Sequence, residues 1–189
     1  MGELGFIDSL APRLVRDPLT RLIPKESAAV AVIFLVEKQR ERILLIRRAE
    51  RVGDPWSGQM AFPGGMVDPK DKSFEETAKR ETKEEVGVDL SPGSAGFLGY
   101  MLRLKARTRD VTVVPAVFEL NSRPELRPNS EVAACEWAAL DDLAREDARS
   151  TYALKVGEMV VPQPSLVHRG DVIWGLTERI ISEIVVGGA

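Results

Sequence analysis

The chain has 189 residues, of which 44% are hydrophobic and 29% charged, and its formal net charge is -3. This composition is that of one globular domain with its own core, and it excludes a disordered or fibrous protein. A mildly acidic chain has no global positive field to attract nucleic acid, so we expect no nucleic-acid partner.

The cysteine content and the length of the hydrophobic runs indicate the cellular compartment in which the protein is expected. Cys135 is the single cysteine, so no intrachain disulfide can form, which favours a reducing compartment. The longest apolar run, 28–36, is far shorter than the roughly 20 residues that cross a bilayer. The first residues also lack the basic and apolar regions of a signal peptide. We therefore expect a cytoplasmic protein with no membrane partner.

An N-terminal extension, residues 1–27, precedes the main domain at 28–189. It mixes apolar and basic residues with several prolines, which predicts a short helix followed by an extended segment that packs on the domain.

The main domain begins with two predicted strands. Residues 28–36 form a continuous β-branched run, typical of a buried strand. A turn at 39–41 leads to a second, antiparallel strand at 42–47. Residues 49–72 are rich in Gly and Pro, and a structured loop of this length is often functional.

The clearest helix is predicted over 73–86. Ser73 and Glu76 fit a capping box, and Gly87 stands where a left-handed C-terminal residue belongs. Further strands are expected at 96–104, 111–120 and 133–138, and further helices at 140–149 and 171–185. Strands on both sides of a central helix predict an α/β sandwich with a mixed sheet.

The predicted helix 73–86 carries a cluster of carboxylates. Glu81, Glu84 and Glu85 are spaced three and four residues apart, so they project from one side of the helix. Magnesium prefers oxygen ligands and would offset their mutual repulsion. Arg80 can pair with a carboxylate and orient it. By spacing alone, this face could equally be solvated surface with ordinary ion pairs.

The loop before the helix favours a site. It contains Phe62-Pro63-Gly64-Gly65, and paired glycines let a backbone approach a ligand closely. Gly-Gly alone would indicate only a turn, but a Gly-Gly turn followed by an acidic helix is a more specific combination.

Residues 65–88 resemble the Nudix box. The residues that match its pattern are Gly65, Arg80, Glu81, Glu84, Glu85, Gly87 and Val88. Asp71 stands where the family has glutamate, one residue further from Arg80 than usual, and Thr82 replaces an aliphatic residue. The shorter side chain of Asp71 affects only a structural contact, while the catalytic half of the box is intact.

The resemblance implies a Nudix-type α/β/α sandwich and a hydrolase that cuts the pyrophosphate bond of a nucleoside diphosphate derivative. It further implies that Glu81, Glu84 and Glu85 bind Mg²⁺ or Mn²⁺, that Arg80 organises them, and that a carbonyl of Gly64 or Gly65 adds a ligand. Metal ions in such a site neutralise the pyrophosphate and activate water.

Three segments are similar to the coenzyme A pyrophosphatase branch of that family: 44–49, 58–65 and 172–177. This resemblance extends over about residues 28–182 and implies cleavage of coenzyme A or an acyl-coenzyme A to 4′-phosphopantetheine and adenosine 3′,5′-bisphosphate. Asp54 and Trp56 depart from the arginine and histidine of the branch. ADP-ribose, another nucleoside diphosphate sugar or a dinucleotide therefore remains an alternative substrate.

Several residues outside the helix are candidates for substrate binding. Arg47, Arg48 and Arg51 precede the loop and can contact phosphates, although solvation at a strand edge explains them equally well. Gly64 and Phe62 belong to the same candidate set.

A general base can lie outside the box. Glu131, in a loop before a strand, is a candidate, although an ordinary surface glutamate explains it at least as well, and Glu136 is a weaker candidate. His168 is the only histidine, and a lone histidine in a loop is more often structural than catalytic. We expect Cys135 in the core and Trp174 packed against the last helix.

Two other classes compete with a hydrolase. Isopentenyl diphosphate isomerases resemble Nudix proteins but need a cysteine upstream of the box, and this chain has none there. Non-catalytic binding modules commonly lose the helix glutamates, whereas all three are present. A homodimer is the commonest oligomer of soluble proteins, but no residue pattern locates an interface.

Overall fold

The structure is a computed structural model that describes residues 5–17, 27–53, 56–106 and 111–186. It contains helices, short 3-10 helices (η) and strands in the following order: α1 (Phe6–Leu10), η1 (Ala11–Arg13), β1 (Ser27–Glu37), β2 (Arg40–Arg48), β3 (Met60–Ala61), β4 (Gly64–Met66), α2 (Phe74–Val86), β5 (Ala95–Tyr100), β6 (Leu104–Lys105), β7 (Thr112–Leu120), β8 (Val132–Ala139), α3 (Leu140–Ala144), η2 (Glu146–Ala148), β9 (Arg149–Val156), β10 (Met159–His168), β11 (Asp171–Trp174) and α4 (Gly175–Val186).

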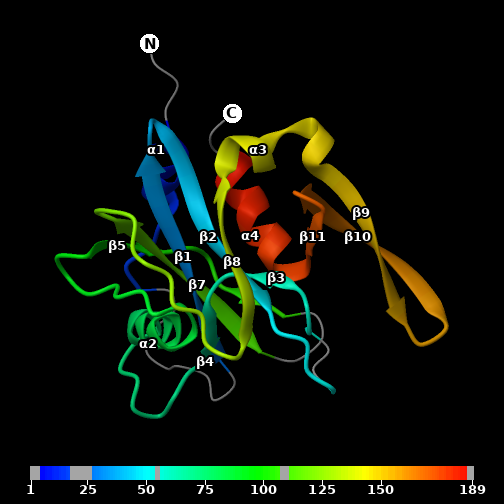
Figure 1. Ribbon diagram of the computed structural model, residues 1–189, viewed down its shortest axis with the longest axis horizontal. Coiled ribbons are helices and arrows are strands. Elements are labelled where there is room, and N and C mark those ends of the chain that lie inside the picture. The colour runs from blue at the N-terminus through cyan, green and yellow to red at the C-terminus, as the bar shows by residue number, and fades with distance from the viewer. Residues whose placement is uncertain (1–4, 18–26, 54–55, 107–110, 187–189) are drawn as a thin grey trace.

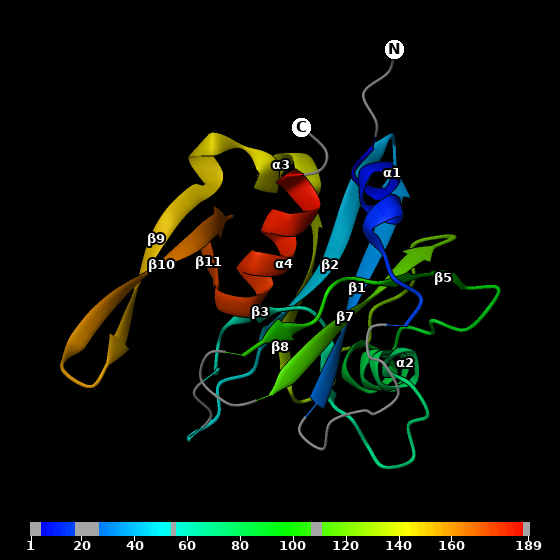
Figure 2. The same ribbon diagram turned by 180° about the vertical axis from the view of Figure 1, so that it is seen from behind.

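A mixed eight-stranded sheet forms the centre of the molecule (Figure 1). Its main path runs β3-β2-β1-β7-β5, with β4 on β1, β6 on β7 and β8 on β2. β1 runs parallel to β7 and antiparallel to β2 and β4. A separate antiparallel sheet, in the order β11-β10-β9, extends from the side of the molecule (Figures 1 and 2).

β1 buries both of its faces, which explains its continuous hydrophobic run. Ala31 and Ile33 face a cluster that includes Phe74 and Ala78 of α2. Alternate residues of β1 face a second cluster, which includes the helix α4 residues Ile180, Ile181 and Ile184. Because strand side chains alternate between faces, α2 and α4 cover opposite sides of the sheet. The expected α/β sandwich with a mixed sheet is confirmed.

The N-terminal helix α1 lies on the α4 side. Leu10 is buried in the α4-side cluster, and Arg13 Nη1 donates a hydrogen bond to the Glu183 carbonyl at 2.8 Å. Val15 forms a bridge with Tyr100 of β5. The boundary expected between residues 27 and 28 stays a prediction. None of the helices in the described part of the chain is long and apolar enough to cross a membrane.

The C-terminal region differs from the prediction. The helix expected over 140–149 ends at Ala144, and the helix expected from residue 171 begins at Gly175, after β11. β9 and β10 were not predicted, because most of their side chains are exposed and β10 contains two prolines. Its pairing with β11 starts at Ser165, so Pro162 and Pro164 have a strand neighbour on one side only, where a missing N–H is tolerated.

Smaller differences occur elsewhere. The strand expected over 96–104 is broken into β5 and β6, and the long loop contains the short strands β3 and β4. Lys38 and Gln39, both with positive φ, make the first turn, one residue earlier than expected.

Candidate active site

Helix α2 begins and ends at the predicted residues. The Ser73 hydroxyl accepts a hydrogen bond from the Glu76 N–H at 3.1 Å, and Gly87 closes the helix with a left-handed φ of 73°. Phe74, Ala78 and Val86 enter the core, which fixes the rotation of the helix about its axis. Glu81 and Glu85 therefore lie against Gly65 and Gly64 of β4.

Strand β4 places two glycines against this helix. Gly64 pairs with Val30 and Gly65 with Ala29 of β1. A Cβ at Gly64 would lie 2.3 Å from the Ala29 carbonyl oxygen, and a Cβ at Gly65 would lie 2.5 Å from the Glu81 carboxyl carbon. A Cβ at Gly64 would meet rigid backbone, so this position requires glycine, whereas a Cβ at Gly65 would meet only the end of a flexible side chain.

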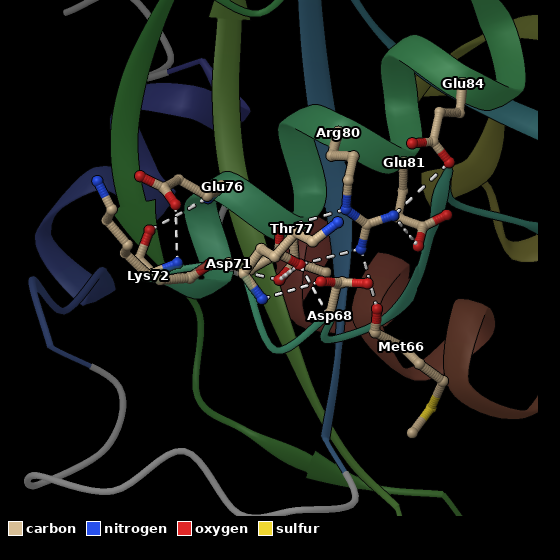
Figure 3. Close-up of polar contacts among 11 residues, drawn as sticks. Met66, Asp68, Asp71, Lys72, Glu76, Thr77, Arg80, Glu81 and Glu84 are labelled. Carbon is tan, nitrogen blue, oxygen red and sulfur yellow. Dashed lines mark hydrogen bonds and ion pairs between the residues drawn. The ribbon is translucent and has the colours of Figure 1, made fainter.

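Arg80 connects the helix to the loop (Figure 3). Its guanidinium donates hydrogen bonds to both Asp71 carboxylate oxygens, at 3.2 and 3.0 Å, and to Glu81 Oε1 at 2.7 Å. It also donates to the Met66 carbonyl at 3.1 Å, and Nη1 lies 3.6 Å from Glu84 Oε2. One side chain thus orients a glutamate and anchors the end of β4.

Asp71 makes a structural contact despite its short side chain. It accepts hydrogen bonds from the Asp68 N–H at 2.9 Å and the Thr77 hydroxyl at 2.8 Å, in addition to those from Arg80. The bonds from Arg80 hold the pKa of Asp71 below its usual value. The extra residue between Asp71 and Arg80 is therefore accommodated in the loop.

Two of the three glutamates lie in a low-polarity environment. Glu85 is 3% exposed, and its Oε2 accepts a hydrogen bond from the Gly64 N–H at 2.9 Å. Burial raises the pKa of Glu85 to about 7, against the effect of that hydrogen bond. Burial also raises the pKa of Glu81, an effect that the hydrogen bond from Arg80 opposes. The Glu84 side chain is 57% exposed.

Glu81 and Glu85 line a cavity of about 470 Å³ together with Gly64 and Gly65. The opposite wall comes from the C-terminal part of the chain, including Leu154 of β9, Gln163 of β10, Trp174 of β11 and the start of α4. The cavity therefore lies between α2, which carries the glutamates, and the C-terminal sheet formed by β9, β10 and β11.

This donor set fits a hard divalent cation. Mg²⁺ usually takes one or two carboxylates and completes its coordination with water and substrate phosphates. Glu81 and Glu85 supply two carboxylates in one cavity, where burial disfavours their charged forms, a cost that a bound cation would offset. Within the described residues, no three Asp, Glu, His or Cys side chains converge as a metal site. The expected part of Glu84 as a third ligand stays a prediction.

The three candidate arginines occupy different places. Arg48 lines the cavity. Arg47 lies 3.1 Å from Asp171 and lines a separate cavity of about 700 Å³. Arg51 Nη1 lies 3.0 Å from Glu131 Oε1, and Glu131 lines the same cavity as Glu81 and Glu85. Phe62, by contrast, is 3% exposed and packs in the core on the α4 side.

The weaker candidates lie outside the cavity lining. His168 is buried in β10 rather than in a loop, and its Nε2 lies 2.9 Å from Glu136 Oε1. Arg169 lies 3.1 Å from the same oxygen. Glu136 borders the separate cavity, as does Cys135, which is half-buried against the core.

Trp174 is a site residue that sequence reasoning missed. Instead of only packing against the last helix, it lines the cavity and stacks on Tyr152, with ring centroids 4.4 Å apart and an interplanar angle of 18°. Trp56 also lines the cavity, whereas Asp54 lies outside the described residues. Lys105 and Arg179 also line the cavity, and no local motif marks them in the sequence.

Comparison with curated proteins finds several relatives. Nudix hydrolase 15, mitochondrial, from Arabidopsis thaliana is 30% identical, with 96% of this chain and 64% of that protein covered. The human mitochondrial coenzyme A diphosphatase NUDT8 is 31% identical, with 85% and 68% covered. An uncharacterized Schizosaccharomyces pombe protein is 44% identical, with 74% and 48% covered. The chain spans about half to two thirds of the length of the first curated relatives it matches.

A solved structure and a family model complete the comparison. A MutT/nudix family protein from Enterococcus faecalis superposes with a TM-score of 0.58 at 22% identity, covering 87% of this chain and 62% of that one, which supports the fold. The family model of the NUDIX domain matches residues 25–155, which include the whole of α2 with its three glutamates. The chain therefore belongs to the Nudix family.

Proposed function

We propose that the protein is a divalent-metal-dependent hydrolase that cuts the pyrophosphate bond of a nucleoside diphosphate derivative. The observation that carries this proposal is the meeting of Glu81 and Glu85 in one cavity, beside a glycine backbone and braced by Arg80. Bound Mg²⁺ or Mn²⁺ would supply positive charge for the pyrophosphate and activate a water.

The protein's own residues have distinct parts in this proposal. Gly64 N–H and Arg80 keep Glu85 and Glu81 oriented before substrate arrives, which lowers the cost of organising the site. Arg48 adds a positive charge to the same cavity for the substrate phosphates. Glu131 is the candidate general base, since it lines the cavity and Arg51 fixes its side chain.

Coenzyme A or an acyl-coenzyme A is the substrate that we propose. The branch resemblance of 44–49, 58–65 and 172–177 supports it, and so does the similarity to human coenzyme A diphosphatase over 85% of the chain. The structure adds that Trp174, in the third of these segments, lines the cavity. Cytoplasmic location and a homodimeric state stay predictions.

A magnesium-dependent hydrolysis screen tests this proposal. It compares coenzyme A, acyl-coenzyme A, ADP-ribose, NADH, diadenosine polyphosphates and nucleoside triphosphates, with products identified by mass spectrometry. Release of 4′-phosphopantetheine and adenosine 3′,5′-bisphosphate at the highest kcat/KM supports the proposed substrate. Preferential cleavage of ADP-ribose or a dinucleotide would keep the hydrolase and reject coenzyme A. Turnover of none of them would favour a binding module.

A further inference from the structure

The lining of the cavity carries charges of both signs. Glu81 and Glu85 of α2 and Glu131, just before β8, are its acidic residues, and Arg48, Lys105 and Arg179 are its basic ones. Apolar and aromatic side chains make up much of the rest, among them Val113, Leu154, Trp56, Trp174 and Leu176. A ligand that fills this cavity thus meets cationic side chains as well as the glutamates.

The register of the sheet gives the distance between the backbone of β4, beside Glu81, and the backbone of β6, which carries Lys105. Met66 of β4 pairs with Ala28 of β1, Ala28 pairs with Val113 of β7, and Val113 pairs with Leu104 of β6. Adjacent strands lie about 4.8 Å apart, so the backbones of β4 and β6 are separated by roughly 14 Å. Lys105 therefore extends from a strand three spacings away from β4, the strand that the Glu81 side chain contacts.

Lys105 and Arg179 are placed together by the fold. Arg179 Nη1 donates a hydrogen bond to the Lys105 carbonyl at 3.1 Å, although the two residues are 74 positions apart in the chain. Arg179 is half-buried and Lys105 is exposed at the rim. This bond keeps the guanidinium beside the backbone of β6, and both cationic side chains line the same cavity. A guanidinium with its fork of donors and an ammonium in one cavity suit a phosphate monoester.

Arg179 lies in a different part of the chain from the glutamates. The matched Nudix model ends at residue 155, whereas Arg179 lies in α4, beyond that end. The glutamates that serve the shared chemistry lie inside the matched region. Arg179 therefore comes from a part of the chain beyond the matched Nudix region, yet it lines the same cavity as the glutamates.

We propose that Lys105 and Arg179 bind a second phosphate of the substrate, a monoester on the nucleoside that is separate from the pyrophosphate being cut. This inference rests on the proposed function and deepens it. Such a phosphate site would distinguish substrates that carry this monoester from those that do not. Coenzyme A carries one on its 3′ oxygen, and ADP-ribose carries none.

The test compares kcat/KM for coenzyme A and for 3′-dephospho-coenzyme A, which differ only in this monoester. We expect the wild-type protein to prefer coenzyme A by about ten- to a hundredfold, the range expected for charge-assisted hydrogen bonds. Arg179→Gln and Lys105→Gln should each move this ratio toward one. Arg103→Gln, which removes a charge from the exposed segment beside β6, should leave the ratio unchanged.

A binding measurement separates this inference from the hydrolase proposal. Calorimetric titration with adenosine 3′,5′-bisphosphate and with AMP needs no turnover. Tighter binding of the bisphosphate, lost in Arg179→Gln and retained in Arg103→Gln, supports the second phosphate site even if no compound is hydrolysed. Equal binding of the two nucleotides, or a preference that survives in Arg179→Gln, would overturn it.

Discussion

Arg80 illustrates how one side chain serves two structural needs. Its guanidinium joins Asp71, Glu81 and the Met66 carbonyl, so it ties the loop to the helix and orients a carboxylate of the cavity. The planar fork of donors can reach three partners at once, which an ammonium on a flexible stem cannot do in the same geometry.

Arg80→Lys should therefore impair activity more than its retained charge suggests. Partners that orient metal ligands typically contribute ten- to a hundredfold, so we expect kcat/KM and apparent Mg²⁺ affinity to fall by about that factor. Steady-state kinetics over a Mg²⁺ titration measure both effects. Arg103→Lys is the matched control on an exposed residue. Unchanged Mg²⁺ affinity in Arg80→Lys would contradict the orienting part assigned to the guanidinium.

The raised pKa of Glu85 predicts how stability depends on pH. Burial raises this pKa to about 7, above the ordinary value of 4.5, so the folded protein binds the proton more tightly than the unfolded chain. The free energy of unfolding should then decrease as pH rises from about 4.5 to about 7, by up to about 3 kcal/mol from this group.

Urea denaturation with a metal chelator, at several pH values between about pH 5 and about pH 8, measures this effect. Glu85→Gln cannot ionise, so its stability should vary less over the same range. Parallel pH profiles for the two proteins would show that Glu85 ionises at its ordinary pKa.

Element by element, the sequence predicted those parts whose signals are local. Helix α2 begins after Ser73 and ends at Gly87 because the cap and the left-handed glycine are encoded within a few residues. β1 was predicted because both of its faces are buried. β9 and β10 have mostly exposed side chains and two prolines, so their pairing depends on neighbours that no local pattern reveals.

The two glycines of β4 should respond differently to substitution. Gly64→Ala brings a Cβ to 2.3 Å from the Ala29 backbone oxygen, whereas Gly65→Ala brings it against the end of the Glu81 side chain. Backbone in β1 cannot move easily, so we expect Gly64→Ala to lower the free energy of unfolding by roughly 1–3 kcal/mol or more.

Gly65→Ala should keep most of its stability and lose activity, because Glu81 can rotate away from the new methyl group but then leaves its place in the cavity. Parallel urea denaturation and hydrolysis assays on the two variants distinguish these effects. Equal losses of stability in both variants would argue against the different environments assigned to them.

At the scale of the whole molecule, the cavity joins segments that are distant in the sequence. The glutamates and glycines could be predicted because a compact motif carries them, and Arg48 and Glu131 were predicted as candidates from nearby segments. Trp174, Lys105 and Arg179 required the tertiary structure. Trp174 and Arg179 reach the cavity when the C-terminal sheet and α4 pack on the core, and Lys105 reaches it through the pairing of β6 with β7.

Trp174→Leu should weaken substrate binding more than it slows the chemical step. The indole is stacked on Tyr152 and lines the cavity, so it offers a rigid surface for a base or another flat group. Aromatic pairs contribute about 0.5–1.5 kcal/mol beyond burial, so KM should rise about two- to tenfold with a smaller change in kcat. Trp174→Phe should restore most of the loss. If kcat falls while KM is unchanged, the indole does not contact the ground-state substrate.

The most direct measurement is the Mg²⁺ dependence of coenzyme A hydrolysis by the wild-type protein, Glu81→Gln and Glu85→Gln, with folding checked by circular dichroism. We predict metal-dependent turnover in the wild-type protein and a loss of at least about a hundredfold in each folded variant, since each removes a charged oxygen ligand from the cavity. Full Mg²⁺-dependent turnover in both variants would contradict the assignment of these two glutamates as the catalytic centre.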